Sequence, residues 1–162
     1  MSVRDRVERI YEAERGNIYS YLLYFGVPAG RAQELAQDSF LKLYQKMENG
    51  DPIDNPRAWL YRVAHNLAVR SHEREPEFDA LDPDFAPPGE QPDPERALIE
   101  SQRRSALVRA IRDLSPQQRN CLYLRVRGLR YREIAETIGI SSSTVGEFLR
   151  RAVTRLKEAM DG

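Results

Sequence analysis

The sequence of 162 residues has little of the side chains that build metal and disulfide chemistry. It contains one cysteine, Cys121, and two histidines, His65 and His72. One cysteine excludes an internal disulfide and a zinc site built from several thiolates, and two histidines supply a metal poorly. We also find no nucleophile beside a base, no glycine-rich phosphate loop and no metal-ligand spacing. We therefore expect no cofactor, no metal site and no enzymatic activity.

Long apolar runs are absent as well. The longest, such as residues 21–25, fall far short of the ~20 residues that a membrane-spanning helix needs. The first residues alternate charges where a secretory signal would carry an apolar stretch. A composition of 41% hydrophobic and 31% charged residues is typical of a soluble globular protein. We expect a cytoplasmic protein with no membrane insertion.

The net charge is zero, but the charges are unevenly spread along the chain. Residues 1–72 carry 10 Lys or Arg against 9 Asp or Glu, residues 73–95 carry 1 against 9, and residues 96–162 carry 14 against 7. This distribution indicates three functional segments, which are neutral, acidic and basic in turn. The basic segment is the candidate for binding a polyanion.

The acidic segment is also rich in proline. Six prolines lie between residues 76 and 94, and proline both breaks helices and removes backbone donors. This composition predicts an extended linker. Two interpretations of it stay open, because it suits either a disordered spacer or an acidic strand that enters a basic channel.

Helices are predicted on both sides of the linker, because apolar residues return every three or four positions and no strand-length alternation occurs. Their expected bounds are 4–25, 29–48, 56–73, 94–113, 116–127, 131–138 and 142–160. Three starts place a capping side chain before a proline, at Asn55, Asp93 and Ser115. Ser115 with Gln118 also fits a capping box.

The last thirty residues predict a helix-turn-helix. Gly139 can close a short helix in the left-handed conformation, Ile140 can fill the corner, and Ser141 can cap the next helix. The fold class is therefore all-α: two small helical domains joined by an acidic Pro-rich linker, the C-terminal one a helix-turn-helix.

The second helix of this motif has two different faces. Val145, Leu149, Ala152 and Leu156 recur at spacings of four, three and four, which predicts a packed face. The other face carries hydroxyl groups and arginines that suit a major groove. The candidate DNA-binding residues there are Ser142, Ser143, Thr144, Glu147, Arg150, Arg151 and Arg155. A solvated surface is the alternative interpretation of that face.

Residues 114–125, 128–136 and 139–157 resemble the C-terminal domain of sigma factors, which reads the minus-thirty-five promoter element. Residues 31–44 resemble the family helix that binds the polymerase clamp, and residues 56–68 resemble the helix that borders the melted minus-ten element. Both halves occur in the family order, as in extracytoplasmic-function (ECF) sigma factors. The resemblance implies a region 2 domain at 1–75, the linker at 76–93 and a region 4 domain at 94–162.

The resemblance also implies an activity and site residues. The chain is expected to bind RNA polymerase core and to direct promoter recognition and transcription initiation. The implied minus-ten contacts are Asn55, Arg62, His65, Asn66 and Arg70. The implied polymerase contacts are Glu34, Gln37, Asp38, Phe40 and Leu41. The loop at 48–55 lies where the family captures an unstacked base, which costs a few kcal/mol to flip out.

The side chains of these helices also suggest packing positions. On the second helix we expect Leu35, Phe40, Leu43 and Met47 to pack inward, and on the third we expect Trp59, Val63 and Leu67 in the core. The implied partners are polymerase core, at its β′ clamp and β flap, and promoter DNA. An anti-sigma factor is a further candidate. The resemblance also places the linker in the RNA-exit path of the polymerase.

The sequence departs from the family pattern at three places. Gly146 and Glu147 stand where the family often has a lysine, residues 69–75 carry fewer basic residues, and Arg130 replaces a common serine cap. Two other classes stay open, and the departures bear on the second of them. One is a helix-turn-helix regulator that does not bind core. The other is a sigma-like decoy that binds core or an anti-sigma partner without starting transcription.

Overall fold

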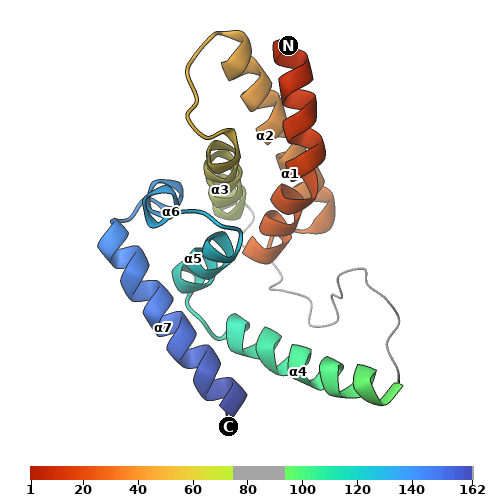
Figure 1. The fold of residues 1–162 in the computed structure, drawn as a ribbon, viewed down its shortest axis with the longest axis vertical. Coiled ribbons are helices and arrows are strands. Elements are labelled where there is room, and N and C mark those ends of the chain that lie inside the picture. Colours follow the sequence, from red (N-terminus) through yellow and green to blue (C-terminus); the bar gives the residue numbers. More distant parts are fainter. Residues whose placement is uncertain (75–93, 162) are drawn as a thin grey trace.

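The computed structural model describes residues 1–74 and 94–161, and within them all regular secondary structure is helical (Figure 1). The helices are α1 (Val3–Phe25), α2 (Ala29–Glu48), α3 (Pro56–Arg74), α4 (Pro94–Arg112), α5 (Pro116–Val126), α6 (Tyr131–Ile138) and α7 (Ser142–Asp161). Every bound lies within one residue of the sequence prediction, so the all-α class is confirmed. The linker predicted at 76–93 and the cap predicted at Asp93 lie outside the described residues.

Side-chain caps explain where two of the helices begin. Ser115 Oγ accepts a hydrogen bond from the Gln118 N–H at 3.2 Å, and Gln118 Oε1 accepts one from the Ser115 N–H at 3.4 Å. The capping box predicted for α5 is therefore confirmed. At the start of α3, Asn55 Oδ1 accepts from the Ala58 N–H at 3.3 Å. Both caps satisfy donors that the first turn leaves unpaired.

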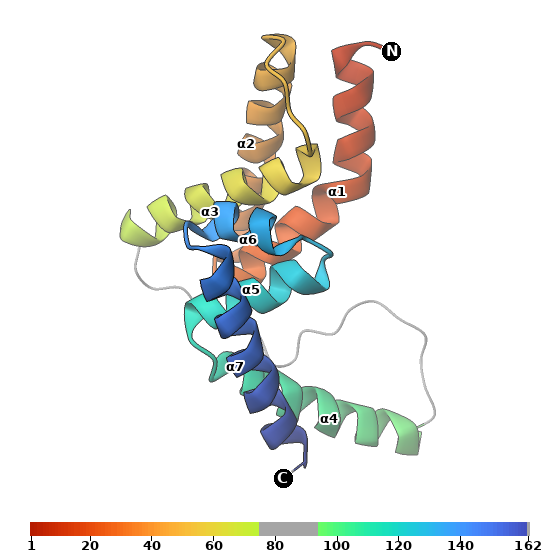
Figure 2. The same cartoon turned by 60° about the vertical axis from the view of Figure 1, so that its left-hand side comes forward.

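Helices α1, α2 and α3 pack on one another as an N-terminal unit (Figures 1 and 2). Ile18, Tyr21 and Leu22 of α1 are fully buried in its core. The packing positions predicted on α2 are confirmed, since all four are buried: Leu35, Phe40, Leu43 and Met47. Burial of apolar area of this kind is the main force that holds small helical units together.

The buried face of α3 differs from the prediction. Trp59, Val63 and Leu67 are only partly buried, although Trp59 and Leu67 pack against the core. The positions that are buried instead are Leu60, Tyr61, Ala64, His65, Ala68 and Ser71. The prediction holds in part for Trp59 and Leu67 and is wrong for Val63, because α3 contacts α1, α2 and α6 and buries a neighbouring arc of its surface.

Helices α4 to α7 form a C-terminal unit in which α7 contacts α4, α5 and α6. Val145, Leu149 and Ala152 of α7 are buried as predicted, and Leu156 is partly buried. By contrast, α4 is mostly exposed, with Ala110 as its one buried residue. It lies against the C-terminal half of α7, away from the N-terminal unit (Figure 2).

The two units are in contact. The contact is made chiefly by α3 with α6, and more weakly by α1 with α5. One cluster of buried residues runs through both units, from Tyr21 of α1 to Cys121 and Leu124 of α5 and Ile134 of α6. No residue spacing in the sequence indicated this contact.

Candidate nucleic-acid and polymerase interfaces

The helix-turn-helix has the local geometry that its sequence predicts. Gly139 adopts the left-handed conformation, with φ of 86°, and its N–H donates to the Ala135 carbonyl at 2.8 Å. After the turn, Ser141 Oγ accepts from the Thr144 N–H at 3.2 Å and caps α7. These two contacts set where α6 stops and α7 starts.

The face of α7 predicted to read DNA lies on the surface. Its exposed members are Ser142, Ser143, Arg150, Arg151 and Arg155, and its partly buried members are Thr144 and Glu147. Arg151 forms an ion pair with Glu147 one turn earlier. Arg155 Nη1 donates to the Asp113 carbonyl at 3.0 Å.

Gly146 has a packing role that the sequence did not reveal. The residue is buried, and a Cβ built on it would lie 3.5 Å from Cε2 of Tyr131. Tyr131 begins α6 and is 43% exposed, and the Arg125 guanidinium lies 5.3 Å from its ring centroid. Position 146 therefore faces the first helix of the motif rather than solvent.

The start of α6 lacks a side-chain cap of the usual kind. Arg130 has no side-chain acceptor to offer the first turn, and it makes no side-chain cap bond. Instead Glu133 Oε1 accepts from the Arg130 N–H at 2.9 Å. Glu133 thus holds the first turn of α6 from within the helix.

Most of the residues assigned to the minus-ten element lie on the surface of α3. Asn55, Arg62, Asn66 and Arg70 are exposed, whereas His65 is 7% exposed. Burial lowers the pKa of His65 to about 4, so its ring is neutral at pH 7.

The contacts of His65 are internal to the N-terminal unit. Its Nδ1 lies 2.7 Å from the Tyr21 hydroxyl, and its ring meets Phe25 edge-on with centroids 5.5 Å apart. The prediction that placed His65 on a DNA-facing surface is wrong, because the packing of α3 on α1 takes the ring out of solvent.

The residues assigned to the polymerase contact are also a mixture of exposed and buried side chains. Glu34, Gln37 and Asp38 are exposed, and Leu41 is 55% exposed. Phe40 is 6% exposed and packs edge-on against Tyr11, with centroids 5.0 Å apart. Phe40 therefore belongs to the core, as its apolar spacing predicted, and the prediction of a surface contact for it is wrong.

A cleft of about 370 Å³ lies between the loop before α3, the first turns of α3 and one side of α6. The N-terminal unit contributes Asn55, Trp59 and Arg62 to its lining, and α6 contributes Glu133 and Glu136, among others. The loop in which the resemblance implied base capture therefore borders a real cavity. One wall of that cavity comes from the other unit.

Comparison with known proteins identifies both units. The family described as Sigma-70 region 2 matches residues 10–76, and the family described as Sigma-70, region 4 matches residues 104–156. RNA polymerase sigma factor YlaC of Bacillus subtilis (strain 168) is 29% identical over 164 residues, which covers 99% of this chain and 95% of the relative. The ECF RNA polymerase sigma factor RpoE of Cereibacter sphaeroides is 30% identical over 147 residues, which covers 88% of this chain and 80% of the relative. The chain belongs to the ECF sigma factors.

The fold supports the same assignment. The sigma factor RpoE of Bartonella quintana, solved in complex with the anti-sigma factor NepR, superposes with a TM-score of 0.71 at 20% identity, over 95% of this chain and 96% of that one. Sigma factors bind RNA polymerase and direct it to promoters, and they are generally not enzymes. No helix in the described part of this factor is both long and apolar enough to cross a bilayer.

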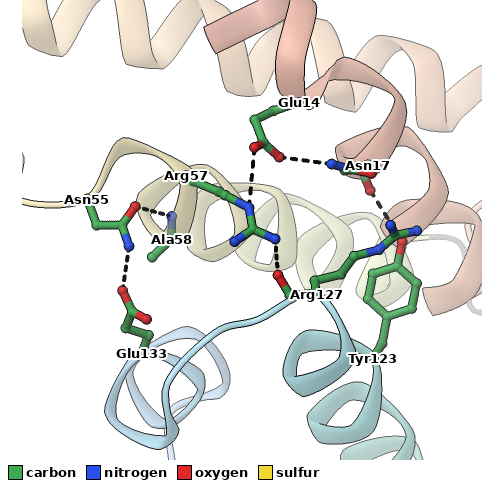
Figure 3. Close-up of polar contacts among 8 residues, drawn as sticks. All are labelled: Glu14, Asn17, Asn55, Arg57, Ala58, Tyr123, Arg127 and Glu133. Carbon is green, nitrogen blue, oxygen red and sulfur yellow. Dashed lines mark hydrogen bonds and ion pairs between the residues drawn. The ribbon is translucent and has the colours of Figure 1, made fainter.

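We call α1–α3 the region 2 unit and α4–α7 the region 4 unit, after the matched ranges. Arg57 of α3 connects the two (Figure 3). Its Nε lies 3.3 Å from Glu14 Oε1 within region 2, and its Nη2 donates to the Arg127 carbonyl of region 4. Beside it, Asn55 Nδ2 donates to Glu133 Oε2 at 2.6 Å.

Tyrosines form a second set of contacts between the units. The Tyr24 hydroxyl donates to the Arg119 carbonyl at 2.7 Å, and the Tyr123 hydroxyl donates to the Asn17 carbonyl at 3.4 Å. The Tyr123 ring lies 4.6 Å from the Tyr24 ring and 5.3 Å from the Tyr21 ring, centroid to centroid. Burial raises the pKa of Tyr21 well above its usual value, so this aromatic cluster is uncharged.

Polar atoms near this contact are not all satisfied. Among the described residues, the Tyr61 hydroxyl and the Arg119 Nε are buried without a hydrogen-bond partner. Leaving such a group unpaired costs about 1 to 3 kcal/mol relative to water.

Sequence reasoning missed these connecting residues. Arg57 and Arg127 are 70 positions apart, and Asn55 and Glu133 are 78 apart. A helix pattern marks which residues face one neighbouring layer, but it carries no signal for polar pairs between separate units. Of these residues only Asn55 was named from the sequence, as a helix cap and as a minus-ten contact.

Proposed function

We propose that the two units divide promoter recognition between them. Residues 1–75 act as the region 2 domain that binds polymerase core and minus-ten DNA, and residues 94–162 act as the region 4 domain that binds the minus-thirty-five element. Residues 76–93 join them. The order and extent of the two matched regions support this division.

The exposed face of α7 is the observation that carries the minus-thirty-five assignment. A capped helix-turn-helix presents hydroxyl groups near the start of α7 and arginines after them, which suits base edges first and phosphates later. We assign contact with the major groove to Ser142, Ser143, Thr144, Glu147, Arg150, Arg151 and Arg155.

The minus-ten site is assigned to the exposed residues of α3 and the loop before it. Asn55, Arg62, Asn66 and Arg70 offer amide and guanidinium groups that suit the polar edges and phosphates of single-stranded DNA. The cleft beside Asn55 is the place for an unstacked base. His65 supports this surface from inside through its bond to Tyr21.

The polymerase contact is assigned to the exposed face of α2. Glu34, Gln37 and Asp38 precede Leu41 on the same face of α2, and the apolar Leu41 side chain is more than half exposed. Protein interfaces combine apolar and polar side chains in this way. We place the clamp of the polymerase on this face.

The factor then works by recruitment in the cytoplasm and catalyses no reaction itself. Region 2 docks on core and stabilises the melted strand while region 4 holds the duplex upstream. A sigma factor of the same fold has been solved with an anti-sigma factor. We propose that a partner of that class also controls this chain.

One experiment tests this function directly. Purified chain is applied with polymerase core that lacks its own sigma factor, and co-elution is followed by run-off transcription from randomised promoters. Co-elution with initiation from a defined motif is expected. Core binding without initiation would identify a decoy, and duplex DNA binding without core binding would identify a plain regulator.

A further inference from the structure

The contact between α3 and α6 conflicts with promoter geometry. If region 2 holds the minus-ten element and region 4 the minus-thirty-five element, the two sites are about 25 base pairs apart by their names, or about 85 Å along B-DNA. Helix α7 has 20 residues and spans only about 30 Å. With α6 packed on α3, region 4 cannot reach its element while region 2 holds the other.

The same contact also closes one side of the cleft in the proposed single-strand site, whereas Arg62, Asn66 and Arg70 stay exposed. The cleft beside Asn55 takes one wall from α6, and that wall carries the carboxylates of Glu133 and Glu136. The amide of Asn55 is already used, because its Nδ2 donates to Glu133 Oε2. A DNA strand in the cleft would bring hydrogen-bond acceptors and negative charge to the Asn55 amide, where the Glu133 carboxylate now supplies both.

We propose that α6 of region 4 closes one side of the cleft beside Asn55 in the free factor, so that region 4 and an unstacked base of single-stranded DNA compete for this cleft. The inference rests on the proposed function of Asn55 and its cleft. Asn55 with Glu133 and Arg57 with the Arg127 carbonyl hold the closed state beside the cleft, and the tyrosine contacts hold it between α1 and α5.

The competition has a measurable consequence. A ligand that binds only the open state has an apparent Kd equal to its intrinsic Kd divided by the open fraction. Changes that weaken the closing contacts therefore raise strand affinity without adding any contact to DNA.

Glu133→Gln is the sharpest variant. Gln keeps the Oε1 that accepts from Arg130, so the start of α6 is preserved. Its amide group, however, faces the donating amide of Asn55. Asn55 cannot rotate its amide to compensate without losing the cap on Ala58. Arg57→Ala is the second variant, because it removes the bond to the Arg127 carbonyl.

Exposed residues supply the matched controls. Glu158→Gln changes the net charge by the same amount at an exposed position of α7, and Arg9→Ala does so on the exposed side of α1. Thermal unfolding followed by circular dichroism shows whether each variant keeps the helical fold. Glu133→Gln is expected to keep it even where Arg57→Ala loses stability.

The single cysteine reports opening independently of DNA. Cys121 of α5 is fully buried and belongs to the buried cluster that also contains Tyr21 of α1 and runs through both units. The rate at which a disulfide reagent such as dithiobis(nitrobenzoate) labels the folded protein therefore follows separation of the units. Strand affinity is measured in parallel with a fluorescent pool of random single strands of about 12 nucleotides.

The expected result is that Glu133→Gln and Arg57→Ala label about three- to tenfold faster and bind the strands about three- to tenfold tighter. Both controls stay at the wild-type values. Unchanged labelling in both variants would overturn the proposal, because the contacts then do not hold the units together. Faster labelling with unchanged or absent strand binding would also overturn it, because region 4 then does not compete with the strand for the cleft.

Failure of the proposed function is a separate outcome. Run-off transcription with polymerase core tests it on the wild-type chain, and the labelling rates do not depend on that result. A chain that initiates transcription but fails the labelling or strand test leaves the sigma function intact and removes only the competition between region 4 and DNA.

Discussion

Helices α3 and α7 both carry candidate DNA contacts, yet the sequence described their faces with very different success. On α7, Val145, Leu149 and Ala152 are buried as their spacing predicts. On α3, the residues expected in the core are only partly buried, and Leu60 and Tyr61 are fully buried instead.

The difference follows from the neighbours of each helix. The main contacts of helix α7 are all with helices of its own unit, and most of the rest of its surface is exposed. Helix α3 contacts two helices of region 2 and also α6 of region 4. A single apolar stripe indicates one packed face, so it describes α7 well and describes a helix between two units poorly.

Truncation of apolar side chains tests this comparison most strongly. Leu60→Ala is expected to lower the free energy of unfolding by about 2 to 5 kcal/mol, because the side chain is fully buried. Val63→Ala, at the position that the spacing placed in the core, is expected to cost less than about 1 kcal/mol. Urea denaturation followed by circular dichroism measures both.

The matched pair on α7 is Leu149→Ala and Val153→Ala. Leu149 is 6% exposed and Val153 is 41% exposed, so the first is expected to cost about 2 to 5 kcal/mol and the second little. A larger loss from Val63→Ala than from Leu60→Ala would contradict the packing of α3.

Protonation of His65 is expected to affect stability at acidic pH. Above about pH 6.5, the ordinary pKa of histidine, the His65 ring is neutral in both the folded and the unfolded state. Between that pH and the folded pKa of about 4, only the unfolded chain binds the proton. The free energy of unfolding should therefore fall as pH falls through this window, by about 3 kcal/mol in all.

His65→Gln keeps a hydrogen-bonding side chain near Tyr21 and removes the titration. Its free energy of unfolding should vary less between pH 6.5 and 4 than that of the wild type, as measured by urea denaturation at several pH values. Equal pH dependence in the two proteins would contradict a role for His65, because titration of carboxylates alone would then account for the loss of stability at low pH.

Substitution of arginines on α7 tests the DNA face. Arg150→Ala is expected to weaken promoter DNA binding by about 1 to 3 kcal/mol if Arg150 meets a base, or to lower the salt slope by about one if it meets a phosphate. Arg151→Ala should cost less, because Arg151 also pairs with Glu147. Fluorescence anisotropy over a range of salt concentrations separates the cases, with exposed Arg103→Ala of α4 as control. Unchanged affinity in both variants and in the double variant would contradict this face.

Glycine substitutions have the smallest expected effect. Gly146→Ala should raise stability by up to about 1 kcal/mol, because alanine favours the helix and its Cβ meets Tyr131 at an ordinary contact distance. Gly139→Ala should lower stability instead, since Gly139 has a positive φ. A lower melting temperature for Gly146→Ala than for the wild type would contradict the inference that a methyl group fits beside Tyr131.

The candidate site was predictable only in part, and the two buried members show why. Phe40 was expected both to pack inward and to contact the polymerase, and only the packing is seen. His65 is a polar residue that a surface would accept, but α1 covers it and Tyr21 bonds it. Family resemblance transfers a position along the chain, whereas exposure depends on which helix covers that position.

Local sequence by itself determined the helices, their caps and the helix-turn-helix, because caps, glycine turns and apolar spacing act over a few residues. It also carried the resemblance that the comparisons confirm. Only the tertiary structure decided which face of α3 is buried and how Arg57, Asn55 and Glu133 join the two units. Those contacts link residues 70 or more positions apart, and such pairs depend on how the two folded units meet.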